Sequence, residues 1–183
     1  MESGQGAGRI VGALTSSLLR EEYASAPEIP MSDAEVLALV ELAQQRGAQS
    51  IAIGSGRHPM CLAGAQALSD AWQHAGGELA LVLDWPETAA SWLRQATRFS
   101  QANADLWIML GPPLGWAQMT RRLLWSTPWK PARALLAGGI SDRRTLDLVG
   151  LHNLPGIAGT TRDGAAWHLS ANDRIIEIQG PGS

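Results

Sequence analysis

Short apolar runs alternate with helix-like stretches along most of this chain, and this alternation constrains the fold more than any other feature. The strand-like runs are residues 48–53, 79–83, 106–110, 132–137 and 156–159. The second run, LALVL, is continuously apolar, which is typical of a parallel strand covered on both faces. The stretches between the runs carry apolar residues at helical spacing.

This pattern predicts an α/β fold, a three-layer Rossmann-like or flavodoxin-like sandwich with a mostly parallel five-stranded sheet. Residues 165–169 and 174–179, joined by Ser-Ala-Asn-Asp, predict a C-terminal β-hairpin. We divide the chain into an N-terminal arm at 1–30, one α/β domain at 31–179 and a tail at 180–183. The arm is either flexible or docked, because Val11, Leu14 and Leu18 have helix-compatible spacing.

Helix starts are marked by capping and proline signals. Ser32 and Glu35 form a capping box, and Pro59 suits the first turn of the next helix. We expect Asp84 and Glu87 to cap a helix that buries residues between 89 and 96, and Ser141 to cap a helix that ends near residue 149.

Composition limits the partners. The chain has 183 residues, a net charge of −3 and a single lysine, so it lacks the basic footprint of a nucleic-acid binder. No run approaches the roughly 20 apolar residues of a membrane span. The N-terminus lacks the layout of a signal peptide, and the single cysteine excludes an internal disulfide. We therefore expect a cytoplasmic protein with no membrane and no nucleic-acid partner.

Residues 54–58, Gly-Ser-Gly-Arg-His, follow the first strand-like run and precede Pro59. A glycine-rich turn between a strand and a helix directs backbone N–H groups at one point, where an anion binds. Parallel strands end at one edge of the sheet, so the other strand ends should lie beside this turn. The predicted binding residues are Gly54, Ser55, Gly56, Arg57, Asp84, Gly139, Ser141, Thr160 and Thr161.

The same turn departs from a dinucleotide fingerprint, because Pro59 stands where G-x-G-x-x-G has its third glycine. Asp84 is placed as an acceptor for a ligand hydroxyl, or else as an ordinary N-cap. Ordinary turn chemistry explains the same residues equally well. The sequence therefore names no cofactor.

His58 and Asp163 are the candidate acid–base groups. An unperturbed histidine titrates near neutral pH, and Asp163 follows the last parallel strand beside Arg162. The alternative for both is an exposed residue at a helix start or turn. The four histidines show no metal-ligand spacing, so no metal site is predicted.

The stretch from Ala134 to Gly164, ALLAGGISDRRTLDLVGLHNLPGIAGTTRDG, resembles the last two strand–helix units of phosphate-binding TIM barrels such as the histidine-biosynthesis isomerases. In those proteins a strand ending in Gly-Gly and the following strand end hold a phosphate together. The chain is shorter than the roughly 200 residues that eight such units need, so the resemblance changes neither the predicted fold nor the candidate residues.

Two functional hypotheses follow. In the first, the protein binds an anionic small molecule, a nucleotide or phosphorylated metabolite, at its strand ends, and group transfer or isomerisation is the favoured chemistry if it is an enzyme. In the second, it is a non-catalytic subunit or scaffold with a degenerate Rossmann-like domain. Trp125, Trp129 and the N-terminal arm would then contact a partner subunit or a second copy.

Overall fold

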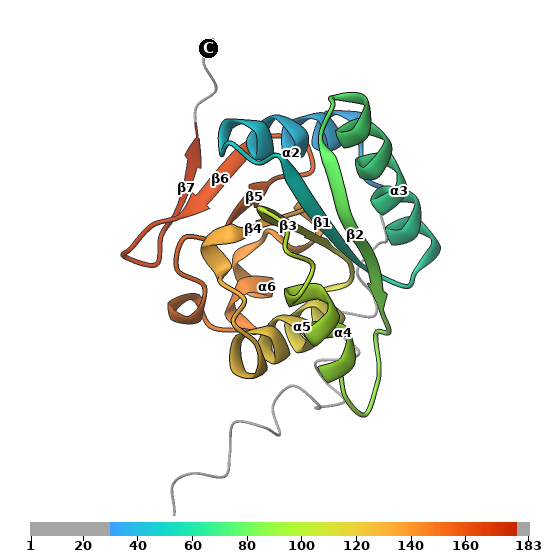
Figure 1. Ribbon diagram of the computed structural model, residues 1–183. Coiled ribbons are helices and arrows are strands. Elements are labelled where there is room, and N and C mark those ends of the chain that lie inside the picture. Colours follow the sequence, from blue (N-terminus) through green and yellow to red (C-terminus); the bar gives the residue numbers. More distant parts are fainter. Residues whose placement is uncertain (1–29, 179–183) are drawn as a thin grey trace, which may run out of the picture.

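A seven-stranded sheet forms the centre of the fold, with the strand order β2-β1-β3-β4-β5-β6-β7 (Figure 1). The computed structural model describes residues 30–178. The strands are β1 (Ser50–Gly56), β2 (Glu78–Trp85), β3 (Leu106–Leu110), β4 (Ala134–Leu136), β5 (Ala158–Thr160), β6 (Ala166–Leu169) and β7 (Ile175–Ile178). The α-helices are α2 (Asp33–Gln45), α3 (Pro59–His74), α4 (Leu93–Ser100), α5 (Pro113–Ser126) and α6 (Arg143–Asp147), and 3-10 turns lie at Pro131–Arg133, Gly138–Ile140 and Leu151–Asn153.

Strands β1 to β5 are parallel, and their order 2-1-3-4-5 is that of a flavodoxin-like doubly wound sheet. The predicted fold class is therefore confirmed. The predicted hairpin is β6–β7, and it continues the same sheet because β6 pairs with β5 in antiparallel fashion.

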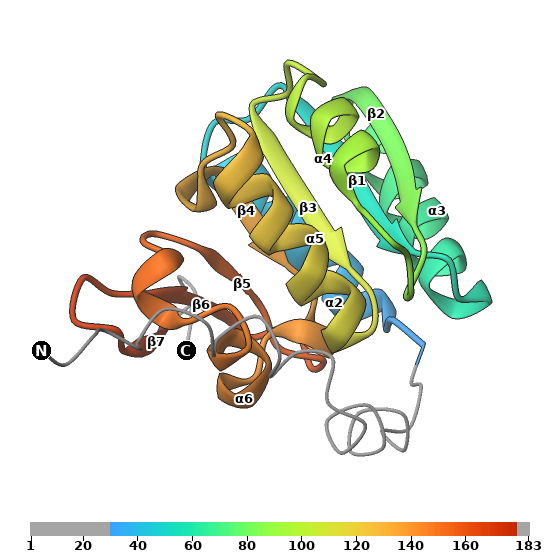
Figure 2. The ribbon, with the colours of Figure 1, turned by 90° about the horizontal axis from the view of Figure 1, so that it is seen from below.

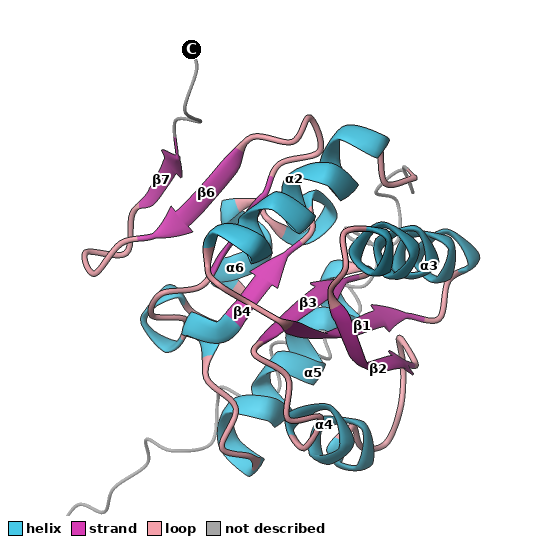
Figure 3. Cartoon of the chain, turned by 45° about the horizontal axis from the view of Figure 1, so that its top comes forward, coloured by secondary structure: helices cyan, strands magenta, loops and turns pink. Residues whose placement is uncertain are grey.

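Helices α2 and α3 cover one face of the sheet, and α4, α5 and α6 cover the other (Figures 1 and 3). Each face has its own apolar core, because neighbouring residues of a strand point to opposite faces. In β1, Ile51 and Ile53 pack toward α2 and α3, while Ala52 packs toward α4 and α5. Gly54 follows this alternation: an added Cβ would lie 2.6 Å from Trp85 and 2.7 Å from Phe99.

Strand β1 runs through Gly56, whereas the sequence analysis placed a glycine-rich turn at residues 54–58, so residues 54–56 belong to the strand. These residues pair with β2 on one side, and Gly54 and Ser55 also pair with β3 on the other. The connection from β1 to α3 is therefore only Arg57 and His58. A strand with neighbours on both sides satisfies its backbone groups in the sheet, and this outweighs the turn preference of glycine.

The first two helix starts match the sequence. Ser32 Oγ accepts a hydrogen bond from Glu35 N–H at 3.1 Å, and Pro59 is the first residue of α3. The predictions for the two later helices were wrong. Helix α4 begins at Leu93, with no side-chain cap, and the cap of α6 is Asp142 rather than Ser141.

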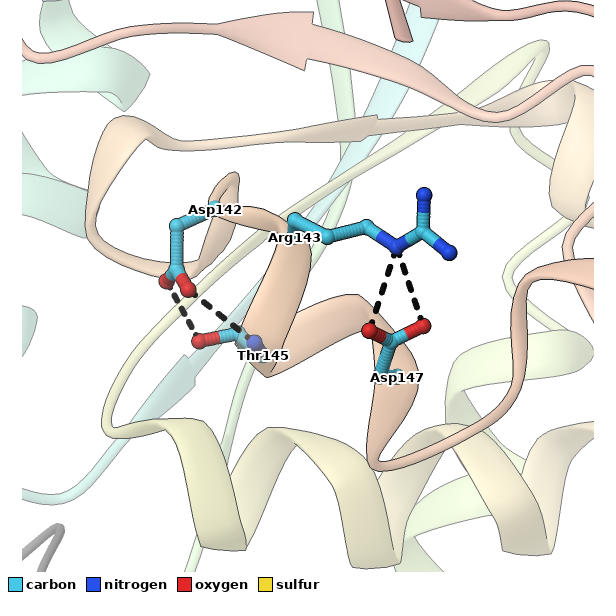
Figure 4. A network of polar contacts seen from close by, with 4 residues as sticks. All are labelled: Asp142, Arg143, Thr145 and Asp147. Carbon is cyan, nitrogen blue, oxygen red and sulfur yellow. Dashed lines mark hydrogen bonds and ion pairs between the residues drawn. The ribbon is translucent and has the colours of Figure 1, made fainter. Parts of the chain in front are cut away.

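Figure 4 shows the start of α6, where Asp142 accepts hydrogen bonds from the N–H of Thr145 at 3.1 Å and from its hydroxyl at 2.5 Å. Ser141 Oγ instead donates to the carbonyl of Ala137 at 2.9 Å. The Asp142 carboxylate thus caps the helix N-terminus, while the hydroxyl of Ser141 bonds to the preceding turn.

The predicted N-terminal arm, apart from Pro30, lies outside the described residues, and so does the predicted tail. None of the helices within residues 30–178 has the length and apolar character that crossing a bilayer requires.

Candidate functional site

The carboxyl ends of β1 and β3 lie side by side, although the chain visits β2 between them. Helix α3 leaves β1 toward one face, and α5 follows β3 on the opposite face (Figure 2). In open α/β sheets ligands bind in the crevice that such a change of direction creates. We call this place the switch-point crevice.

The backbones of the two strand ends approach closely in the crevice. Gly111 has φ +149°, and an added Cβ there would lie 3.0 Å from Gly56 N. On the other side of Gly56, an added Cβ would collide with the carboxylate of Glu87, and a Cβ on Gly115 would collide with the same carboxylate. Glycine at both positions therefore makes room for the side chain of Glu87.

Glu87 comes from the loop after β2, and both of its carboxylate oxygens are buried. One oxygen lies beside Gly115, the third residue of α5. A negative charge is favoured at a helix N-terminus, where backbone N–H groups carry partial positive charge. The chain's own carboxylate thus occupies the position where the sequence analysis expected an external anion.

Arg57 lies just beyond the end of β1, on the solvent side of the crevice. Its Nε donates to Asp84 Oδ1 at 2.5 Å, and the side chains are 56% and 45% exposed. Among the described residues the two Nη groups of Arg57 donate to no acceptor. The structure therefore brings together two predicted binding residues from neighbouring strands and leaves the Arg57 side chain more than half exposed.

His58 is half-buried and caps α3: its Nδ1 accepts from the N–H of Met60 at 3.4 Å. A ring nitrogen that accepts a hydrogen bond is unprotonated, so the imidazole is fixed with its lone pair on the helix. Ser55, buried inside β1, has no hydrogen-bond partner for its hydroxyl among residues 30–178.

A second cluster of polar residues lies at the same edge of the sheet, at the carboxyl ends of β4 and β5. Glu35 Oε1 accepts from Gly138 N–H at 2.6 Å. Burial raises the pKa of Glu35, while the N–H of Gly138, the charge of Arg162 and the N–H of Ser32 oppose that rise. Helix α2 therefore closes this part of the edge through its first turn.

Gly139 is half-buried, and an added Cβ would lie 3.5 Å from an Nη of Arg162. Thr160 is fully buried, and its hydroxyl has no hydrogen-bond partner within the described part of the chain. Thr161 donates its hydroxyl to Asp163 Oδ1, and this bond is the main reason why the pKa of Asp163 lies below its ordinary value. Asp163 is thus ionised at neutral pH and poorly suited to proton transfer there.

The predicted residues fall into two groups at one edge. His58, Arg57 and Asp84 lie at β1 and β2, whereas Asp163 and the threonines lie at β5. Three strand spacings separate β1 from β5, a distance of about 14 Å. The structure does not place His58 and Asp163 within reach of one substrate atom. Within residues 30–178 no cluster of metal-ligating side chains occurs.

The two tryptophans predicted to contact a partner differ. Trp125, at the end of α5, is 61% exposed, and Arg121 lies over its ring with Cζ 5.0 Å from the centroid. Trp129 is 4% exposed and belongs to the core between the sheet and α5, so its assignment to a surface patch was wrong. A loop rich in proline and tryptophan gave no signal to separate the two.

Glu87 and Glu35 were missed as site residues. Glu87 was considered only as a helix cap, and its contact with Gly56 joins loops that the sequence does not connect. Glu35 was recognised as a capping residue, but its bond to Gly138 spans 103 positions. Contacts between residues so far apart in the chain produce no local sequence pattern.

No protein-family model matches this chain, and no curated protein matches it. Solved structures with similar folds include solute-binding proteins of ABC transporters. One, from Rhodopseudomonas palustris HaA2 in complex with p-hydroxybenzoic acid, has a TM-score of 0.59 and 17% identity, over 70% of this chain and 35% of that one. A putative branched-chain amino acid ABC transporter protein from Rhodospirillum rubrum has a TM-score of 0.59 and 15% identity, over 76% of this chain and 39% of that one.

A leucine-binding protein from Thermotoga maritima MSB8 has a TM-score of 0.57 and 15% identity, over 70% of this chain and 35% of that one. These similarities establish a common α/β fold between this chain and part of each solute-binding protein. The chain spans less than two fifths of the length of each of these proteins.

Proposed function

We propose that this chain is a ligand-binding domain that holds a small organic acid at the carboxyl edge of its sheet, beside the switch-point crevice. The observation that carries the proposal is Arg57. It follows strand β1, donates through Nε to Asp84, and has a side chain that is 56% exposed. A guanidinium held in this way binds a carboxylate through two parallel hydrogen bonds.

A carboxylate fits this edge better than a nucleotide. The amides of residues 54–56 lie inside β1, so they do not form the cradle of N–H groups that a phosphate needs. The side chain of Glu87 already fills the space beside Gly56 and Gly115, so a phosphate has no room there. Similar folds in solute-binding proteins, one of them in complex with p-hydroxybenzoic acid, support the same ligand class.

Binding is favoured over catalysis. His58 and Asp163 are three strands apart, and the lowered pKa of Asp163 removes it as a proton donor at neutral pH. The group-transfer and isomerisation reactions considered from the sequence both need two acid–base groups at one centre.

The test is calorimetric titration of 4-hydroxybenzoate, benzoate and inorganic phosphate into the wild-type chain and the Arg57→Ala variant. We expect the carboxylates to bind the wild type more tightly than phosphate does. Arg57→Ala should weaken carboxylate binding about tenfold or more, because a charge-assisted bidentate contact contributes roughly 1.5–3 kcal/mol.

Arg143→Ala is the matched control. Arg143 also donates through Nε to an aspartate, Asp147, at 3.1 Å, and its side chain is 60% exposed (Figure 4). It lies on α6, away from the crevice, so its removal should leave carboxylate binding unchanged. Equal affinities of the wild type and Arg57→Ala would refute the proposed site.

A second function, as a non-catalytic subunit of a larger assembly, is favoured by one observation. Trp125 exposes 61% of its surface at the end of α5. Exposed tryptophan beside arginine is typical of protein contact surfaces.

A further inference from the structure

Strand β2 forms one edge of the sheet, because β1 lies on one side of it and no strand within residues 30–178 lies on the other. Helix α3 contacts β2 on one face and α4 contacts it on the other, so this edge has three layers (Figures 1 and 3). With eight residues, β2 is also the longest of the described strands. An edge strand of this length presents a row of backbone N–H and C=O groups to which another strand can pair.

Apolar side chains border this edge on both faces of the sheet. Val82 is 48% exposed, and it pairs with Ile53, which packs toward α3. Leu62, in the first turn of α3, is exposed on that face as well. On the other face lie the half-buried Leu81 and Leu93, the exposed first residue of α4. We call Leu62, Leu81, Val82 and Leu93 the β2 edge strip.

The flank of α3 that carries Leu62 faces β2. Gly64 lies on the other flank, where an added Cβ would be 3.0 Å from Leu110 of β3. Because β3 lies beyond β1 as seen from β2, that flank faces the middle of the sheet. Ser69 follows Leu62 by two turns on the same flank and is buried, as expected for a position over the sheet.

Leu62 and Val82 also lie at nearly the same level along the edge. Trp72 Nε1 donates to the carbonyl of Glu78 at 2.8 Å, which places the last part of α3 beside the start of β2. Leu62 precedes Trp72 by about 15 Å of helix, and Val82 follows Glu78 by about 13 Å of strand. Since α3 joins the parallel strands β1 and β2, it runs opposite to β2, and the two side chains form one patch.

We propose that the β2 edge is a dimer interface, at which β2 of one copy pairs in antiparallel fashion with β2 of a second copy. A two-fold axis perpendicular to the sheet relates the same edge on both copies. The two sheets then join into one, and the β2 edge strips of the copies meet. The interface lies along the side of the sheet rather than at its carboxyl edge, and it does not rest on the proposed function.

The charges on β2 select the position of this axis. The strand carries Glu78 at its start and Asp84 near its end, and it has no basic residue. An axis at Leu81 would set Glu78 opposite Asp84 of the second copy, and like charges directly opposite each other are destabilising. An axis at Val82 avoids that pair. Val82 then faces Val82 of the second copy, and Leu81 faces Leu83 of the second copy, so apolar residues meet at the centre.

Few of the devices that prevent edge strands from pairing occur in β2. Lysine and proline are absent from residues 78–85. A bulge at Ala80 is the exception, because the residues on either side of it pair with consecutive residues of β1. Residues 81–85 pair with β1 without interruption, so an axis at Val82 falls in the regular part of the strand.

The edge is large enough for a specific dimer. An axis at Val82 pairs residues 79–85, a stretch about 23 Å long. A helix is about 10 Å across, so the three layers make the edge about 30 Å thick. The product, about 700 Å² per copy, is close to the roughly 800 Å² per partner of a standard interface.

Sedimentation velocity of the full chain tests this interface. We expect a wild type that dimerises and a Val82→Lys variant whose dissociation constant is about tenfold higher or more, because the substitution sets two positive charges opposite each other at the axis. In the monomer the lysine can extend into solvent, since Val82 is half exposed, and the fold is retained. A wild type that is monomeric at every concentration, or equal dissociation constants for the two proteins, would overturn the proposal.

Leu37→Lys is the matched control. Leu37 is exposed, as Val82 is, but it lies on α2, which contacts β5 and β6 on the far side of the sheet. Its substitution should leave the dissociation constant unchanged, and so should Trp125→Ser. A dimer that dissociates in Trp125→Ser but not in Val82→Lys would assign the contact to the end of α5 and reject the β2 edge.

A cross-link covers the case in which Val82→Lys does not fold. In a Cys61→Ser background, which removes the chain's only cysteine, Val82→Cys should form a disulfide-linked dimer under mild oxidation. Directly opposite residues of antiparallel strands have Cα atoms about 4.5–5.5 Å apart, within the range of a disulfide. Leu37→Cys in the same background should give no linked dimer. Dimers seen by sedimentation without a Val82→Cys cross-link would contradict the proposed pairing.

Discussion

At the scale of single residues, two glycines and one glutamate decide what the switch-point crevice holds. Gly56 ends β1 and Gly115 lies in the first turn of α5, and the Glu87 carboxylate fits between them only because neither has a Cβ. The N-terminus of α5 has no side-chain cap from Pro112, and the Glu87 carboxyl group lies beside this uncapped end.

Gly115→Ala should therefore destabilise the protein. The new methyl group collides with the Glu87 carboxylate, and overpacking of this kind costs about 1–3 kcal/mol, which exceeds the roughly 1 kcal/mol that alanine gains over glycine in a helix. Urea denaturation measures the loss. Gly139→Ala is the control, because its methyl group would only contact Arg162 at 3.5 Å.

The same collision predicts a rescue. Glu87→Ala combined with Gly115→Ala should recover part of the lost free energy of unfolding, because the methyl group then has room. A double variant that is no more stable than Gly115→Ala alone would show that Glu87 is not the group displaced.

Sequence patterns predicted residues whose partners are near in the chain. The Ser32–Glu35 cap and Pro59 at the first position of α3 are both observed. The sequence patterns did not predict that Glu87 fills the crevice, because the loop that carries Glu87 has no periodic pattern of apolar residues. The glycines at 54 and 56 were assigned to a turn, whereas they serve close packing against Trp85 and Glu87 inside a strand.

At the scale of elements, one side chain ties β1 to β3 at their amino ends. Asp105, just before β3, accepts with Oδ2 from the N–H of Gln49 and of Ser50, both at 2.9 Å, and from the Ser50 hydroxyl at 3.0 Å. These bonds lower the pKa of Asp105, the N–H of Ser50 contributing most. The carboxylate thus helps to set the register of the two central strands.

Asp105→Ala should lower the free energy of unfolding by about 1–2 kcal/mol at pH 7, a modest loss because the carboxylate is exposed. The folded pKa lies below the ordinary value of 3.8, so the contribution is complete above that pH and disappears as the pH falls through the folded pKa. Urea denaturation of both proteins at pH 7 and near pH 3 should show the difference shrinking. Asp105→Asn, which keeps an acceptor, should lose less.

The elements themselves were largely predictable, since each apolar run became a strand and the hairpin appeared where turn residues predicted it. Boundaries were less predictable. β1 extends three residues beyond the predicted run, through Gly56, because it pairs with neighbouring strands. Helix α4 begins only at Leu93, after a loop in which Trp92 Nε1 donates to the Pro86 carbonyl. Both outcomes depend on tertiary neighbours.

At the scale of the whole molecule, the eight tryptophans differ in whether they are buried or exposed. Six are buried, while Trp125 is exposed at the end of α5. Trp125 and Trp129 are neighbours in sequence, but only one of them holds the fold together.

Trp129→Ala should therefore cost about 3–5 kcal/mol of unfolding free energy, whereas Trp125→Ser should change it by no more than about 0.5 kcal/mol. Thermal or urea unfolding compares the two. Sedimentation adds a test of the subunit function. A wild-type dimer that becomes a monomer in Trp125→Ser would support that function, and identical masses at every concentration would exclude Trp125 from self-association.

The strand order has a consequence for synthesis on the ribosome. Once β1 and β2 have paired, every later strand joins next to the one made just before it, or beside β1 in the case of β3. From β3 onward the sheet therefore grows in one direction only, and each new strand pairs with an edge strand that has already been synthesised. This order suits domains that fold from the N-terminal side while translation proceeds. No strand has to be inserted between two partners after the chain is released.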